Sequence, residues 1–131
     1  MKVLLVSADP LVREAIQLTV RGVKRSIGDG PIEFLEAKDG VDGMRMAWRH
    51  QPDVVVADEI TSRAGAFALA KDLTGSEPPH QARIVILLDR PQDEWLAAWS
   101  GADAWFVKPI NPFQVADVLT GLLAAPHKEA V

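Results

Sequence analysis

The chain has 131 residues, of which 48% are hydrophobic and 24% charged, a composition typical of one soluble globular domain. With 14 Lys and Arg against 18 Asp and Glu, its net charge of -4 provides no broad basic field, so no nucleic-acid partner is expected. The absence of cysteine excludes disulfides, thiol nucleophiles and cysteine-based zinc sites.

Five short apolar runs alternate along the chain with segments of helical periodicity. They predict strands at Val3–Val6, Ile32–Leu35, Val54–Ala57, Ile84–Leu88 and Trp105–Val107. Runs that are rich in Val, Ile and Leu, without polar alternation, are typical of parallel strands buried on both faces. The alternation therefore predicts an α/β fold in which crossover helices connect the strands of a parallel sheet.

The helical segments have recognisable start signals. Asp9 and Pro10 are suited to begin the first helix, because a carboxylate can accept the free N–H groups there and proline fits the first helical position. The other helices are predicted at Asp39–His50, Ala66–Leu73, Gln92–Ser100 and Pro112–Ala124, the last of them capped by Asn111.

The chain shows no internal repeat or linker that would divide it. Residues 1–125 are expected to form a single domain, and residues 126–131 a frayed tail. Within the first helix, Leu11, Ala15 and Leu18 follow helical spacing.

The ends of the predicted strands contain the residues with most functional information, because ligands of open parallel sheets bind beyond the carboxyl ends of the strands. Asp58 ends the central predicted strand, and Lys108 follows the last one. We therefore expect this carboxylate to lie near this ammonium group.

Along nearly its whole length the chain resembles the receiver domain of response regulators. The matching segments are Val3–Val6, Asp9–Arg13, Ala37–Gly40, Pro52–Asp58 and Gly101–Pro109. The resemblance implies a flavodoxin-like, doubly wound fold of five parallel strands and five helices, acting in two-component signal transduction or a phosphorelay. It also implies that Asp58 accepts a phosphoryl group, that Lys108 stabilises its charge and that the Lys108–Pro109 peptide bond is cis.

The residues expected around Asp58 depart from the receiver pattern. Receivers have two acidic residues after the first strand that hold Mg²⁺, whereas this sequence has Ser7 and Ala8, followed by Asp9. Because Mg²⁺ needs oxygen ligands and an alanine side chain has none, metal binding by Asp58 and the Ile60 carbonyl is expected to be weak or absent. No cofactor is expected, other than Mg²⁺ if phosphorylation is retained.

Two further departures concern the conformational switch of the family. Leu88 replaces the Ser or Thr that contacts the phosphoryl group, and Asp89 replaces the small residue after it. The aromatic switch position is retained as Trp105, but without a hydroxyl group at Leu88 the usual coupling is not expected. These departures favour an atypical, stand-alone receiver, a pseudo-receiver with a degenerate acidic pocket, which signals by protein contacts.

Three interpretations of Asp58 are open. In the first, Asp58 and Lys108 form a structural ion pair, with an attraction of about 4 kcal/mol at roughly 4 Å and an effective dielectric near 20, before desolvation costs. In the second, the chain is a functional single-domain receiver phosphorylated on Asp58 by a histidine kinase, with Asp9 or Glu59 replacing the missing ligands. In the third, Asp58 acts in general acid/base catalysis; no nucleophile or histidine accompanies it, so no enzymatic activity is expected. A more distant alternative for the whole chain is a flavodoxin-like enzyme that binds a small molecule.

A pair of tryptophans points to a protein interface. Trp95 and Trp99 lie one turn apart in the helix predicted over residues 92–100. Comparison with receivers predicts Trp95 in the core, and Leu96 and Trp99 at positions that are normally polar and exposed. Because exposed tryptophan is enriched at binding hot spots, Leu96 and Trp99 are interface candidates, and this helix is the candidate surface for a homodimer.

The expected partners are proteins, with a histidine kinase among the candidates. No apolar run in the sequence is long enough for a membrane span, so no membrane insertion is expected. The lack of cysteine suits a reducing compartment, and the expected location is the cytoplasm.

Overall fold

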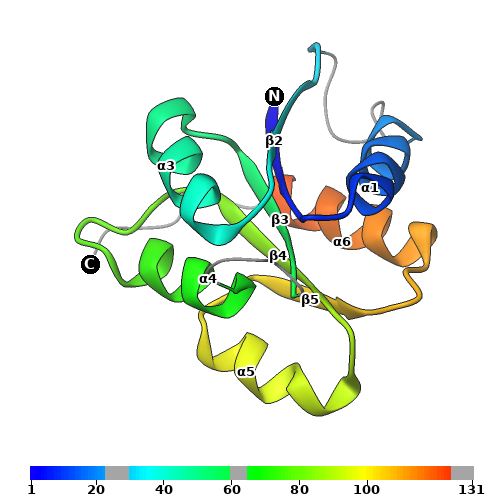
Figure 1. Ribbon diagram of the computed structural model, residues 1–131. Helices are drawn as coiled ribbons and strands as arrows, with labels where there is room; N and C mark the ends of the chain where they lie inside the picture. Colours follow the sequence, from blue (N-terminus) through cyan, green and yellow to red (C-terminus); the bar gives the residue numbers. More distant parts are fainter. Residues whose placement is uncertain (23–29, 60–64, 125–131) are drawn as a thin grey trace.

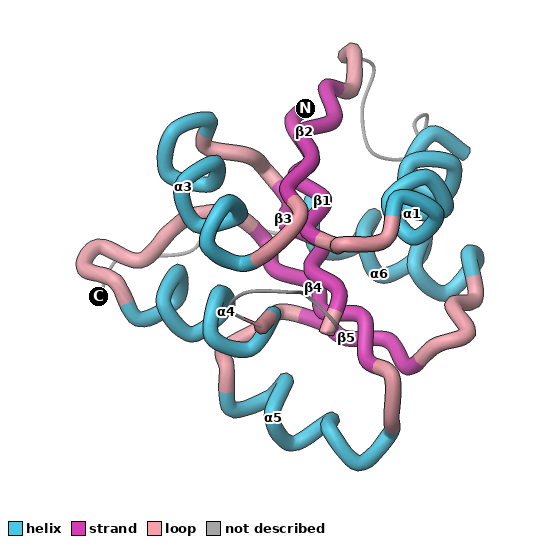
Figure 2. The backbone as a smooth tube through the Cα atoms, in the orientation of Figure 1, coloured by secondary structure: helices cyan, strands magenta, loops and turns pink. Residues whose placement is uncertain are grey.

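The computed structural model describes residues 1–22, 30–59 and 65–124. Five strands form one parallel sheet in the order β2-β1-β3-β4-β5 (Figures 1 and 2). The strands are β1 (Lys2–Val6), β2 (Glu33–Ala37), β3 (Val54–Asp58), β4 (Arg83–Leu88) and β5 (Ala104–Val107). Because every neighbouring pair is parallel, the carboxyl ends of all five strands meet at one edge. The predicted flavodoxin-like, doubly wound sheet is confirmed.

Helices cover both faces of this sheet (Figures 1 and 2). On one face lie α1 (Pro10–Gly22) and α6 (Pro112–Ala124), and on the other lie α3 (Gly40–His50), α4 (Ala66–Gly75) and α5 (Glu94–Trp99). The helix predicted over residues 92–100 begins instead as a 3₁₀ turn, Pro91–Asp93, because the Asp93 N–H donates to the Arg90 carbonyl. The other predicted helices are present.

The strands contribute alternate residues to two hydrophobic cores. On the α3, α4 and α5 face, the buried strand residues are Leu4, Val6, Ala37, Val55, Ala57, Ile84, Ile86 and Leu88. On the α1 and α6 face they are Val3, Leu5, Val54, Val56, Val85 and Leu87. Because the central strands are buried on both faces, their sequences read as continuous apolar runs.

The ends of three elements at the carboxyl edge follow sequence expectations. Asp9 Oδ1 accepts a hydrogen bond from the Leu11 N–H at 2.9 Å and so caps α1. Asn111 Oδ1 accepts from the Phe113 N–H at 3.0 Å at the start of α6. The Lys108–Pro109 peptide bond is cis, as expected.

The apolar residues on the surface of α1 are not those that face the sheet. Ile16 and Val20 are buried, whereas Leu11 and Leu18 are 71% and 62% exposed.

Among the described residues, no helix is long and apolar enough to cross a membrane. The predicted tail, residues 126–131, lies outside the described part of the chain.

Two glycines provide a matched test of the backbone. Gly101 has a φ of +85°, and a Cβ there would lie 2.7 Å from Thr74 Oγ1, which itself donates to the Ser100 carbonyl. Gly121 lies in α6, and a Cβ there would meet nothing within 4 Å. We expect Gly101→Ala to lower the free energy of unfolding by about 1–3 kcal/mol and Gly121→Ala to raise it by up to about 1 kcal/mol. Urea denaturation measures both, and a stable Gly101→Ala variant would contradict this description of the turn.

Candidate functional site

Asp58 is a buried carboxylate at the carboxyl edge of the sheet. Its side chain is only 4% exposed. Lys108 Nζ, beyond the end of β5, donates to Asp58 Oδ1, and Ser7 Oγ, beyond the end of β1, donates to Asp58 Oδ2 at 2.8 Å. The expected proximity of Asp58 and Lys108 is therefore present, and both oxygens of the carboxylate are engaged by the chain itself.

Lys108 has a second carboxylate partner that the sequence did not indicate. Its Nζ atom lies 3.1 Å from Asp89 Oδ1, so the ammonium group bridges two aspartates. Burial by itself lowers the pKa of Lys108, but the hydrogen bonds and charges of Asp58 and Asp89 outweigh it, and the pKa is raised. Lys108 therefore remains charged at neutral pH.

Ser7 is held in place from two directions. Its hydroxyl oxygen accepts from the Asp9 N–H at 3.0 Å while donating to Asp58. Arg13 on α1, whose side chain is 14% exposed, donates from Nη1 to the Ser7 carbonyl at 2.5 Å and pairs with Glu36 at 3.0 Å. Sequence reasoning did not single out Arg13, because an arginine on a helix has no local signal for a backbone partner in a loop.

Glu59 belongs to a second polar cluster beside Asp58. Its Oε2 atom accepts from the Asp89 N–H at 2.6 Å, and its carboxyl group interacts electrostatically with that of Asp93, which pairs with Arg90 at 3.1 Å. Burial and then the Asp93 carboxyl group raise the pKa of Glu59, while the Glu59 carboxyl group and then Arg90 lower the pKa of Asp93. Glu59 is therefore the weaker acid of the two.

Asp9 and Glu59, the possible replacements for the missing metal ligands, have other partners in the structure. Ala8 contributes a methyl group, the Asp9 carboxylate caps α1, and Glu59 bonds to the loop after β4. In the described ranges, no three or more Asp, Glu, His or Cys residues come together as a metal-binding group. The donor set there does not fit a carboxylate-held Mg²⁺; the Ile60 carbonyl lies outside the described residues.

The two switch positions lie in the core between the sheet and α5. Leu88 is fully buried, and Trp105 packs against the same core cluster. The indole Nε1 of Trp105 donates to Glu94 Oε2 at 3.1 Å, so its polar contact is to α5.

The tryptophans of α5 both face outward. Trp99 is 55% exposed as expected, and Lys71 Nζ lies 4.7 Å from the centre of its ring. Leu96 is only half-buried. The expectation that Trp95 lies in the core is wrong: it is 67% exposed, because Asp93 and Ala97 form the buried face of this short segment and Trp95 lies opposite them.

A second exposed apolar surface was missed by the sequence reasoning. Leu11, Leu18 and Phe113, the last 82% exposed, lie on α1 and α6. These two helices border a groove of about 350 Å³, whose lining residues are Ala15, Ile16, Leu18, Thr19, Ile110 and Pro112. Helical spacing alone does not say which side of an amphipathic helix faces the sheet when both sides contain leucine or isoleucine.

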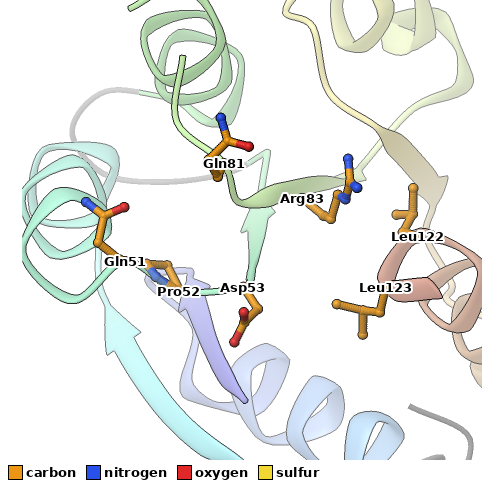
Figure 3. Close-up of a pocket in the computed structure, with 7 residues that line it drawn as sticks. All are labelled: Gln51, Pro52, Asp53, Gln81, Arg83, Leu122 and Leu123. Atoms are coloured by element: carbon orange, nitrogen blue, oxygen red, sulfur yellow. The ribbon is translucent and has the colours of Figure 1, made fainter. Parts of the chain in front are cut away.

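The described residues line pockets at both edges of the sheet. A small cavity of about 10 Å³ lies between Asp58, Ser7 and the α1 residues Val12, Arg13 and Ile16. A larger pocket of about 200 Å³ lies at the opposite edge, and its lining residues are Gln51, Pro52, Asp53, Gln81, Arg83, Leu122 and Leu123 (Figure 3). It contains none of the residues predicted from the sequence.

The chain is similar to known signalling proteins. An uncharacterized response regulatory protein of Mycobacterium tuberculosis is 30% identical over 130 residues, 96% of this chain and 93% of that protein. No protein-family model matches the chain.

Two solved structures share its fold. One is the receiver domain of a sensor histidine kinase of Pseudomonas aeruginosa with a coordinated magnesium ion, with a TM-score of 0.78 and 17% identity over 95% of this chain and 98% of that one. The other is the BeF3-activated receiver domain of RstA from Klebsiella pneumoniae, with a TM-score of 0.77 and 23% identity over 95% and 100%. At these identities the likeness concerns the fold alone.

The raised pKa of Glu59 predicts a pH-dependent stability. Because the pKa of Glu59 is raised above 4.5, its contribution to the free energy of unfolding is fully present below that pH and is lost as the pH rises through the native pKa. Glu59→Gln keeps a neutral donor toward Asp93 at every pH. Urea denaturation measures the free energy of unfolding of both proteins. We expect the variant to gain most over the native chain at pH 7 and this gain to decrease toward pH 4.5.

The control is the same substitution in an Asp93→Asn background, where the partner carboxylate is gone and the pH-dependent part of the difference should diminish. If the change in stability caused by Glu59→Gln stays constant between these pH values, the raised pKa of Glu59 is contradicted.

Proposed function

The chain belongs to the response-regulator receiver family of two-component signal transduction, and we propose that it is an atypical receiver that signals by protein contacts, with phosphorylation of Asp58 weakened or lost. The observation that carries this proposal is that Lys108 and Ser7 hold both oxygens of a nearly buried Asp58. The proposal includes no enzymatic turnover.

The energetics of the carboxylate support weak acceptance of a phosphoryl group. A buried carboxylate without partners is costly, and here Lys108 and Ser7 satisfy it. To attack a phosphoryl donor, an oxygen of Asp58 must give up part of these contacts. Each lost hydrogen bond to the charged group adds about 1.5–3 kcal/mol to the cost of the reaction.

The arrangement around Asp58 also supports the loss of the metal. The hydroxyl of Ser7 is already used by Asp58, and Ala8 has no side-chain oxygen. Mg²⁺ usually takes one or two carboxylates besides its waters and phosphate. We therefore propose that the protein works without a cofactor.

The switch residues support an output that does not depend on phosphorylation. Leu88 has no hydroxyl group to offer a phosphoryl oxygen, and the indole N–H of Trp105 is bonded to Glu94. The expected result is one signalling conformation, recognised by other proteins.

A protein partner is supported by exposed aromatic surface on α5. Trp95 and Trp99 present large apolar rings to solvent, a feature enriched at interaction hot spots. We include a homodimer through this helix in the proposal and no nucleic-acid partner. A cytoplasmic location belongs to it as well, because a chain without cysteine suits a reducing compartment.

The second candidate is a working receiver that a histidine kinase phosphorylates on Asp58. The contact between Lys108 and Asp58 favours this candidate, because it matches the family pattern.

Intact-mass spectrometry after incubation with acetyl phosphate and Mg²⁺ separates the two candidates. We expect neither the native chain nor Asp58→Asn to gain the mass of a phosphoryl group within the time that saturates a working receiver run alongside. If the native chain alone gains one phosphoryl group, the second candidate is correct.

The self-association of the protein tests the α5 surface. We expect sedimentation velocity to show a concentration-dependent dimer, and Trp99→Ala to weaken it about 30-fold, since truncating a hot-spot residue costs about 2 kcal/mol or more. Half-buried Leu96 should contribute less. Phe113→Ala, on α6, is the control and should leave the dimer intact. A native chain that stays monomeric at all concentrations would exclude the homodimer.

A further inference from the structure

We propose that Asp89 is a resident counter-anion that gates Asp58: it occupies Lys108 and adds negative charge where a phosphoryl donor must approach. The inference rests on the proposed function, because it gives a cause for the weak phosphorylation of Asp58. From the sequence, Asp89 was noted only because it stands where receivers have a small residue.

The pairing of Asp89 with Lys108 follows from the register of the sheet. Leu88 and Val107 are paired across β4 and β5, and the Lys108 N–H donates to the Leu88 carbonyl at 2.8 Å. Asp89 directly follows β4 and Lys108 directly follows β5, so the two residues are neighbours. Their side-chain contact of 3.1 Å is thus a consequence of strand pairing.

The position of Asp89 is fixed from the other side by Glu59. The Asp89 N–H donates to Glu59 Oε2 at 2.6 Å, and the Glu59 N–H donates to the Leu87 carbonyl at 2.8 Å. Glu59 in turn interacts electrostatically with Asp93, which pairs with Arg90. Asp89 is consequently held in place by contacts of both its backbone and its side chain.

Asp89 is the outer carboxylate of the pair that shares Lys108. Its side chain is 28% exposed, against 4% for Asp58. The three side chains together have two negative charges and one positive charge. An anionic donor near Asp58 is therefore repelled by the more exposed carboxylate of Asp89, and like charges raise the barrier to association.

The transfer itself requires Lys108 to change partners. A carboxylate oxygen of Asp58 forms a bond to the phosphorus of acetyl phosphate, the bond between phosphorus and the acetyl oxygen breaks, and acetate leaves with the electron pair. The two negative charges of the phosphoryl group then lie on Asp58, beside Lys108. Asp89 competes with them for the same ammonium group.

The substitution Asp89→Asn removes this charge while it keeps the size of the side chain and the N–H that binds Glu59. We expect Asp89→Asn to gain one phosphoryl group from acetyl phosphate about tenfold faster than the native chain, or more, by intact mass, with and without Mg²⁺. Asp72→Asn, which removes an exposed carboxylate from α4, is the matched charge control and should behave as the native chain. The double variant Asp58→Asn with Asp89→Asn should gain no mass.

Ionic strength provides a readout that a merely structural role of Asp89 would not move. Salt screens the repulsion between the donor and Asp89, so the rate of the native chain should rise with salt, and the rate of Asp89→Asn should rise less. With incubations long enough to label the native chain, this measurement also tests the proposal if Asp89→Asn does not fold.

The outcomes separate the gate from the proposed function. If neither the native chain nor folded Asp89→Asn is labelled, the gate is wrong and the proposed function stands. Should both be labelled at the same high rate, both ideas fail. A native chain that is labelled readily, with Asp89→Asn faster still, would overturn the proposed function and support the gate.

Discussion

The burial of one carboxylate organises the carboxyl edge of this protein. Asp58 ends the central strand at a point where the core on both sides excludes water, so its charge requires partners. Lys108 and Ser7 provide them, and each is itself held, Lys108 by Asp89 and Ser7 by Arg13. In the absence of a carboxylate cluster for a metal among the described residues, protein groups stabilise the charge.

The same edge is connected to the surface that we propose for protein contacts. Glu59 follows Asp58 and interacts electrostatically with Asp93, the last residue of the turn that precedes α5. Trp105 makes a second link through its hydrogen bond to Glu94, the first residue of that helix. These contacts fix the helix that carries Trp95 and Trp99 against the edge that holds Asp58.

The elements that could be predicted are those whose cause is local. Continuous apolar runs identify doubly buried strands, and Asp9 and Asn111 cap helices through bonds to residues two positions away. The pairing of Asp58 with Lys108 was also predictable, because parallel strands bring their carboxyl ends together. The orientation of Trp95 was not, since it depends on a 3₁₀ turn and on which side of α5 meets the sheet.

The sequence by itself determined the order of strands and helices along the chain, the parallel sheet and the two charged residues at its carboxyl edge, because hydrophobic periodicity and strand ends are encoded by residues close in the chain. Only the tertiary structure decided which neighbours those charges have. Asp89, Arg13 and Glu59 acquire their partners from elements 6 to 34 residues away. Buried His80 is similar. Its Nδ1 atom accepts from the Ala82 N–H, and its Nε2 atom hydrogen-bonds with the Ala47 carbonyl, 33 residues away. Such partners follow from strand register and helix packing, which short-range sequence patterns do not specify.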